Sequence, residues 1–231
     1  MQPATQYTSN KYLKLNNGLS LPFKGLGTFC GDNFREVITT AVSLGYRHID
    51  TAKLYKNEKE IGEILAELFS SKKIKREEIW ITTKVYNEPT SDIIDDVKSS
   101  LQDLKLDYVD LVLIHWPFGR LQEDNFTIKQ HPMHVIWAKM EECVKLGLTK
   151  SIGVSNCNCQ MLCDIMSYCK IKPVMLQIES HPYLTQTDLI QFCQRYGIQV
   201  TAYSPLCRGG TQPKKSIISY FLKKKFHFFA F

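Results

Sequence analysis

Short apolar runs alternate with amphipathic stretches of helical length along most of the chain, and this alternation constrains the fold more than any other feature. The runs are rich in β-branched residues, and the stretches between them carry apolar residues at three- and four-residue spacing, which is typical of strands followed by helices. Strands are predicted at residues 24–29, 47–52, 79–85, 109–115, 151–155, 174–178 and 199–203. Helices are predicted at residues 34–44, 59–70, 91–104, 133–146, 158–169 and 187–196.

The order of these elements predicts the α/β class and, within it, a TIM-type parallel β/α barrel. No linker-like segment interrupts the series, so residues 1–206 are predicted to form a single barrel domain. A β-hairpin is predicted at residues 11–22, with an Asn-Asn-Gly turn. Residues typical of helix termini stand where the predicted helices begin or end: Asp92, Asp188, Gly45, Gly147 and Gly197.

Residues 207–231 break this pattern and form an atypical basic and aromatic tail. The tail is too short and too irregular to supply an eighth strand together with its helices. We therefore expect an open barrel that lacks its eighth βα unit, from a chain that is C-terminally truncated relative to a complete barrel. Such a barrel exposes unpaired strand groups on two edges.

The formal net charge of +6 comes from the C-terminal part of the chain. Six basic residues and no acidic residue lie between residues 205 and 231, which leaves 23 basic against 23 acidic residues before them. A neutral body gives no reason to expect a nucleic-acid partner. No run approaches the roughly 20 apolar residues that span a bilayer, and no secretory signal is visible, so a cytoplasmic protein without membrane contact is expected. The eight cysteines lack paired zinc-ligand spacing and are expected to be free thiols.

Four polar side chains fall at the ends of three consecutive predicted strands, which is the end of a β/α barrel where active sites lie. Asp50 ends the second strand and Tyr55 follows it, Lys84 lies near the end of the third, and His115 closes the fourth. Taken one at a time, these residues have structural explanations: Asp50 can be a strand-end cap, Tyr55 a loop aromatic and His115 a core histidine. Lys84 is more informative, because a charge in an apolar strand requires a carboxylate partner.

Together these groups suit carbonyl reduction, which needs a hydride donor and a proton donor at the developing alkoxide. A tyrosine with a pKa of about 10 gives up its proton reluctantly at neutral pH. A neighbouring Lys84 would stabilise the tyrosinate and lower the pKa of Tyr55, with Asp50 pairing Lys84. His115 would orient the carbonyl oxygen by hydrogen bonding.

Several separate segments resemble the aldo-keto reductase family. The segment GYRHIDTAKLYKNEKEIG resembles the family signature around its catalytic aspartate and tyrosine, and TTKV and IHWP resemble the segments that carry its catalytic lysine and histidine. Further similarity lies in LGLTKSIGVSNCN, MLQIE and AYSPL, so the resemblance runs from about residue 12 to residue 206. It implies that Asp50, Tyr55, Lys84 and His115 are the catalytic residues, and that NADPH is the cofactor, with NADH as the alternative.

The same resemblance implies the cofactor and substrate contacts. Ser155, Asn156 and Gln177 would hold the nicotinamide carboxamide, and Tyr203 would stack on the ring. Apolar side chains would wall the substrate pocket, which suits aldehydes and ketones with hydrophobic bodies. The implied cofactor residues are Gly27, Thr28, Asp50, Ser155, Asn156, Gln177, Tyr203, Ser204 and Leu206, and the implied substrate residues are Phe29, Leu54, His115 and Trp116, with Phe118 as a further wall.

The sequence departs from the family pattern in three places. No Pro-Lys-Ser type motif for the 2′-phosphate of NADPH follows at the expected distance, and the similar residues 212–216 are interpreted as coincidence. The C-terminal loop that closes over substrate in the family is absent as well. Cys157 stands where an aromatic residue is usual, which would loosen local packing without touching the chemistry.

The leading hypothesis is an NADPH-dependent enzyme that reduces aldehydes or ketones, acts as a monomer and needs no metal. A catalytically silent barrel that serves as a regulatory or interaction module is the alternative, because the cofactor clamp is missing and the barrel is open. A metal-dependent hydrolase is the third reading. It would need ligands that the first strand does not offer, and His131 and His134 have no obvious partners.

Overall fold

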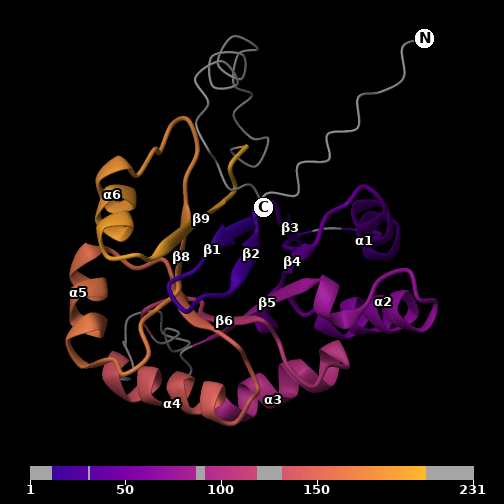
Figure 1. Cartoon of the computed structure of the whole chain (residues 1–231), viewed down its shortest axis with the longest axis horizontal. Helices are drawn as coiled ribbons and strands as arrows, with labels where there is room; N and C mark the ends of the chain where they lie inside the picture. The colour runs from indigo at the N-terminus through magenta and orange to yellow at the C-terminus, as the bar shows by residue number, and fades with distance from the viewer. Residues whose placement is uncertain (1–11, 31, 87–91, 119–131, 207–231) are drawn as a thin grey trace, which may run out of the picture.

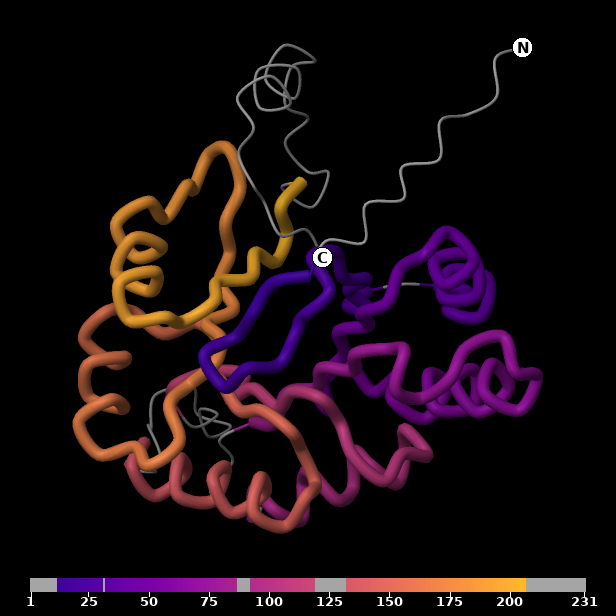
Figure 2. The backbone as a smooth tube through the Cα atoms, in the orientation of Figure 1, coloured from indigo at the N-terminus to yellow at the C-terminus, as the bar shows by residue number. Residues whose placement is uncertain are grey.

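In the computed structural model of the chain, the structure describes residues 12–30, 32–86, 92–118 and 132–206. A parallel sheet curls around an axis, helices cover its outer face, and a two-stranded hairpin lies across one end of the ring (Figure 1). The backbone circles the axis once, from indigo at the first barrel strand to yellow at the last (Figure 2). The predicted α/β barrel is therefore confirmed.

The sheet has seven parallel strands, and each pairs with its neighbours in chain order. All seven predicted strands are present, and most are a residue or more shorter than predicted because only the paired central residues belong to the ladder. The strands are β3 (Leu26–Gly27), β4 (His48–Asp50), β5 (Trp80–Val85), β6 (Leu111–Ile114), β7 (Ile152–Ser155), β8 (Met175–Glu179) and β9 (Gln199–Tyr203).

Within the described residues, each barrel strand except the last is followed by an α-helix. The helices are α1 (Phe34–Ser43), α2 (Glu58–Ser70), α3 (Ile93–Leu104), α4 (Met133–Lys145), α5 (Cys159–Tyr168) and α6 (Thr187–Arg195), with the short 3₁₀ helices η1 (Lys53–Tyr55) and η2 (Arg76–Glu78) between them. Asp92 caps α3 as predicted, because its side chain accepts a hydrogen bond from the backbone N–H of Ile94 at 2.7 Å. Asp188 lies in the first turn of α6, but Gln186 occupies the cap position and no side chain caps that helix. The three predicted glycines follow helix ends with positive φ: Gly45 at 90°, Gly147 at 73° and Gly197 at 70°.

The hairpin of β1 (Tyr12–Lys14) and β2 (Ser20–Pro22) closes the amino-terminal end of the barrel. Leu21 is 1% exposed and packs in one core cluster with residues of β5, β6 and β8. The hairpin turn is tied to the barrel by a hydrogen bond from Nδ2 of Asn16 to the carbonyl of Pro173 at 2.9 Å. With this end plugged, the carboxyl ends of the strands are the open end of the barrel interior.

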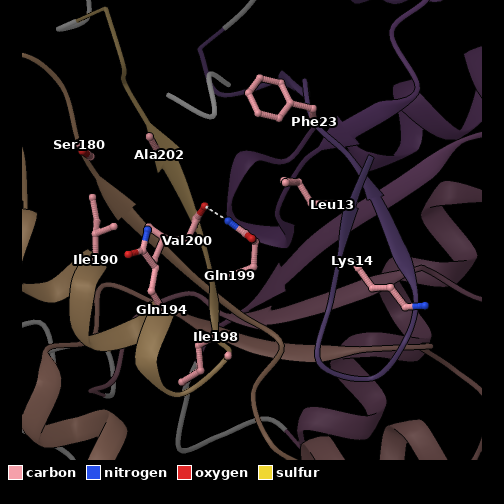
Figure 3. Close-up of a pocket in the computed structure, with 11 residues that line it drawn as sticks. Leu13, Lys14, Phe23, Ser180, Ile190, Gln194, Ile198, Gln199, Val200 and Ala202 are labelled. Carbon is pink, nitrogen blue, oxygen red and sulfur yellow. Dashed lines mark hydrogen bonds between the residues drawn. The ribbon is translucent and has the colours of Figure 1, made fainter. Parts of the chain in front are cut away.

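Within the described residues, β3 and β9 each have one paired side, so the ring of strands is not closed by hydrogen bonds there. The expected lack of an eighth βα unit concerns residues 207–231, which lie outside the described residues. An apolar groove of about 490 Å³ lies along this edge, between α6, β9 and the hairpin (Figure 3). Its apolar walls include Leu13, Phe23, Ile190, Val200 and Ala202. Among the described helices, none is long and apolar enough to cross a membrane.

Candidate active site

The carboxyl ends of the barrel strands surround a cavity of about 570 Å³. Because all strands of the barrel run parallel, the residues that end or follow each strand meet at this one face. The cavity lining is Gly27, Thr28, Phe29, Cys30, Asp50, Leu54, Tyr55, His115, Trp116, Ser155, Asn156, Gln177, Tyr203 and Ser204. The structure therefore brings together residues that are up to 177 positions apart in the sequence.

Lys84 lies beneath this cavity and is 1% exposed. Its ammonium forms an ion pair with the carboxylate of Asp50, donates to the carbonyl of Thr51 at 2.9 Å and donates to the hydroxyl of Tyr55 at 3.2 Å. Burial alone lowers the pKa of Lys84, but the charges and hydrogen bonds of Asp50 and Tyr55 outweigh burial and raise this pKa above its ordinary value. The side chain is thus held as a cation directly beside a phenol.

Tyr55 is placed by η1, the single 3₁₀ turn that follows β4. Its backbone N–H donates to the carbonyl of Ala52 at 2.9 Å, and Lys56 leaves the turn in the left-handed region, with φ 56°. The Tyr55 ring lies 5.0 Å from the Phe29 ring and 5.6 Å from the His115 ring, between centroids. The proton donor predicted from the sequence therefore stands between an apolar wall and an imidazole.

His115 directly follows β6 and is 8% exposed. Burial, helped by the positive charge of Lys84, lowers the pKa of His115 to about 3. The imidazole is therefore neutral at physiological pH. Its Nδ1 atom is buried and has no hydrogen-bond partner within the described part of the chain.

A second group of polar side chains lines the cavity from β7 to β9. Asn156 has φ 60°, donates from Nδ2 to the carbonyl of His115 at 2.9 Å, and accepts from the hydroxyl of Tyr203 at 2.8 Å. The hydroxyl of Ser155 donates to the carbonyl of Gln177 at 3.0 Å. Gln177 in turn donates from Nε2 to Asp50 at 2.8 Å, across the barrel, which joins this group to the Lys84 cluster.

The structure separates two of the predicted residues from the rest. Leu206 is 73% exposed and does not line the cavity, and the Phe118 ring stacks near Trp116, at 5.5 Å between centroids, without lining it. Cys157 is 2% exposed, so this departure from the family pattern leaves a buried side chain. Residues 212–216 and the rest of the tail lie outside the described residues.

Sequence reasoning missed two features of the site. Cys30, the residue after Phe29, also lines the cavity. It directly follows the predicted strand at residues 24–29, and this place in the sequence could have indicated it. Asn57 is buried beneath the Tyr55 turn, where its amide contacts two strand ends. In the sequence it looks like the cap of α2, and no local pattern marks it otherwise.

Across the described residues, no three His, Cys, Asp or Glu side chains cluster as metal ligands do. His134 lies at the start of α4, where its ring packs against that of Tyr168 at 6.0 Å between centroids. His131 is outside the described residues.

Comparison with known proteins identifies the family of the chain. The model of the aldo/keto reductase family matches residues 17–225 of the chain. The chain belongs to the aldo/keto reductase family.

Relatives in that family include aldose reductase C of Dictyostelium discoideum, which is 43% identical over 224 residues that cover 89% of this chain and 70% of the relative. The aldo-keto reductase family 1 member A1 of Gallus gallus is 41% identical over 209 residues, covering 84% of this chain and 64% of the relative. The structure of the aldose reductase from Schistosoma japonicum superimposes with a TM-score of 0.84 at 35% identity, covering 95% of this chain and 82% of that one. An aldo-keto reductase of Bombyx mori in complex with NADP gives a TM-score of 0.83 at 34% identity, covering 93% of this chain and 76% of that one.

Proposed function

We propose that this protein reduces the carbonyl group of aldehydes or ketones to an alcohol with NADPH, and that Tyr55 is the proton donor. The observation that carries the proposal is the buried Asp50–Lys84–Tyr55 cluster, in which a phenol that lines the cavity contacts an ammonium beneath it. Relatives named as aldose reductases support the reaction class, and the solved structures of aldo-keto reductases with NADP or NADPH support the cofactor.

The residues of the cavity fit a nicotinamide cofactor. The hydroxyl of Ser155 and the amides of Asn156 and Gln177 supply the donors and acceptors that a carboxamide requires, and Tyr203 supplies an aromatic ring beside them. Both hydrogens of the Asn156 Nδ2 group are donated, to the carbonyl of His115 and to the hydroxyl of Ser155, whereas its Oδ1 accepts from Tyr203 and keeps a second lone pair for a carboxamide donor. When bound, the cofactor supplies the hydride that is added to the carbonyl carbon.

The chain's own residues handle the proton. The Tyr55 hydroxyl gives its proton to the oxygen that becomes the alkoxide, and the ammonium of Lys84 stabilises the phenolate left behind. His115 is neutral and buried at the same face, so it hydrogen-bonds the carbonyl oxygen without adding charge. Phe29, Leu54 and Trp116 offer apolar surface to the body of the substrate.

A titration of the purified chain with NADPH, followed by turnover with an aromatic aldehyde, tests the proposal. We expect saturable quenching of tryptophan fluorescence and aldehyde-dependent loss of NADPH absorbance. Binding without turnover of any aldehyde or ketone would contradict the proposal, and would favour the alternative of a silent binding module. A folded, monodisperse chain that binds neither NADPH nor NADH would contradict both the cofactor and the reaction.

A further inference from the structure

Asn57 stands at the cap position of α2, but it does not cap the helix. An asparagine at this position ordinarily accepts a hydrogen bond from the first turn, whereas Asn57 makes no such bond. Its side chain points the other way: Oδ1 accepts from the hydroxyl of Thr51 at 2.8 Å, and Nδ2 donates to the carbonyl of Thr28 at 2.8 Å. With 7% exposure, this amide is a buried tie between the ends of β3 and β4.

Both partners of Asn57 lead to the reacting groups. The carbonyl of Thr51 accepts from the ammonium of Lys84 at 2.9 Å. The backbone N–H and the hydroxyl of Thr28 each donate to the carbonyl of Asp50 at 3.0 Å. Thr28 also lines the cavity beside Phe29, whereas Asn57 and Thr51 do not line it. Each hydrogen-bond partner of Asn57 therefore contacts one of the predicted catalytic residues: Thr51 contacts Lys84, and Thr28 contacts Asp50.

Asn57 also anchors the turn that carries Tyr55. Only Lys56, in the left-handed region, separates the two residues. The turn is held at one end by the bond from the Tyr55 N–H to the Ala52 carbonyl, and at the other by the Asn57 side chain. Proton transfer is sensitive to this placement, because the hydroxyl must stay within hydrogen-bond reach of both Lys84 and the substrate oxygen.

We propose that Asn57 is a positioning residue for the reaction: by tying Thr51 to Thr28, it holds the Tyr55 hydroxyl against Lys84 and the Tyr55 ring against the ring of Phe29. This inference rests on the proposed carbonyl reduction and assigns to Asn57 no contact with substrate or cofactor. Removing the amide leaves the fold's hydrophobic contacts in place but frees the turn and the Thr51 carbonyl to shift.

The variant Asn57→Ala removes both arms of the tie, and Thr51→Val removes only the hydroxyl arm while keeping the backbone carbonyl that Lys84 contacts. Asn16→Ala is the matched control, because Asn16 also donates one partly buried bond to a backbone carbonyl, that of Pro173 at 2.9 Å, at the opposite end of the barrel. For each protein we would measure kcat, KM, the Kd for NADPH and the pH dependence of kcat.

For Asn57→Ala we expect kcat to fall by about 10- to 100-fold, the loss typical of a catalytic group misplaced by an ångström or less, while the Kd for NADPH changes by less than about 3-fold. The alkaline limb of the kcat profile should move to higher pH, because a phenol that loses its ammonium neighbour returns toward its ordinary pKa of about 10. Thr51→Val should shift the profile in the same direction with a smaller loss of kcat. Asn16→Ala should keep the wild-type profile.

The proposal is overturned if Asn57→Ala keeps the wild-type kcat and profile, or if Asn16→Ala loses kcat equally. Should Asn57→Ala not fold, Thr51→Val decides: an unchanged kcat and profile reject the positioning role, and a shifted profile supports it. The wild type separates this failure from that of the proposed function. A wild-type chain that binds NADPH but reduces nothing rejects both, whereas an active wild type with unaffected variants rejects only the role of Asn57.

Discussion

At the scale of single residues, the site depends on how one buried charge is compensated. An ammonium with 1% exposure would be very costly if it were alone. Lys84 has three oxygen partners, from Asp50, Thr51 and Tyr55, and this number matches its three donor hydrogens. The lysine therefore keeps its charge, and that charge acts on the one partner that lines the cavity and can lose a proton, the phenol of Tyr55.

Replacing Tyr55 by phenylalanine removes the hydroxyl and keeps the ring that packs against Phe29. We expect kcat to fall by at least about 100-fold, the lower range for loss of a general acid, with little change in the affinity for NADPH. Steady-state NADPH oxidation and a fluorescence titration measure the two effects. Tyr196→Phe, at a 50% exposed residue after α6, is the control and should behave as the wild type. A Tyr55→Phe enzyme with an undiminished rate would remove Tyr55 from the role of proton donor.

At the scale of elements, close contacts between neighbouring α-helices and strands decide where small residues are required. Gly62 on α2 faces the last turn of α3, and a Cβ atom built there would lie 2.2 Å from the carbonyl oxygen of Asp103. Gly153 on β7 is similar, because its Cβ would lie 2.6 Å from the carbonyl oxygen of Met175 on β8. Both obstacles are backbone atoms, which cannot move aside without shifting a whole element.

The variant Gly62→Ala tests the contact between α2 and α3, because the sign of the change in unfolding free energy shows whether the contact is rigid. Alanine in a helix is intrinsically favoured over glycine by up to about 1 kcal/mol, but overpacking at a rigid contact costs about 1–3 kcal/mol or more. We expect a net loss of unfolding free energy in urea denaturation, because α2 must move away from α3. Lys59→Ala, at an exposed position of the same helix, should change stability by no more than about 0.5 kcal/mol. A stabilised Gly62→Ala protein would show that the two helices adjust freely.

At the scale of the whole molecule, the barrel gathers its polar groups at one end and its apolar plug at the other. The bond between Gln177 of β8 and Asp50 of β4 crosses the barrel, so the two halves of the site are fixed relative to each other by more than the strand ladder. Two imidazoles are also held neutral inside the barrel. Burial, with the charge of Lys84, lowers the pKa of both His48 and His115 to about 3.

These two pKa values predict a loss of stability in acid. An unfolded histidine has a pKa of about 6.5, so below that pH the unfolded state binds protons that the folded state does not. These histidines do not reduce the free energy of unfolding above pH 6.5. As the pH falls from 6.5 toward 3, each histidine lowers the free energy of unfolding by at most about 1.4 kcal/mol per pH unit. Urea denaturation at pH 7.5 and pH 5 should show this loss.

The variant His48→Asn should roughly halve the part of the acid slope that comes from these two histidines, whereas His134→Asn, at an exposed position of α4, should leave it unchanged. Burial raises the pKa of Glu58, so this carboxyl has the opposite effect: its protonation stabilises the folded state as the pH falls. Because Glu58 is present in every variant, comparing them with the wild type cancels its contribution. An equal slope in His48→Asn and the wild type would show that His48 is not held neutral by burial.

The sequence by itself determined the barrel, because the alternation of strands and helices follows from patterns among residues that are close in the sequence. Period-two and period-3.6 patterns depend on neighbouring residues, and all seven strands and six helices were found where those patterns lie. The residues that line the cavity were also largely predictable, since parallel strands bring their carboxyl ends to one face whatever their distance in the chain. Their individual roles stay predictions.

Only the tertiary structure decided how those side chains are connected. That Gln177 reaches Asp50 across the barrel depends on curvature and strand register, which no local pattern encodes. The same holds for Asn57, whose sequence context indicates a helix cap and whose amide turns instead toward Thr51 and Thr28. A buried polar group takes the partners that the packed fold places within reach, and those partners come from separate strands.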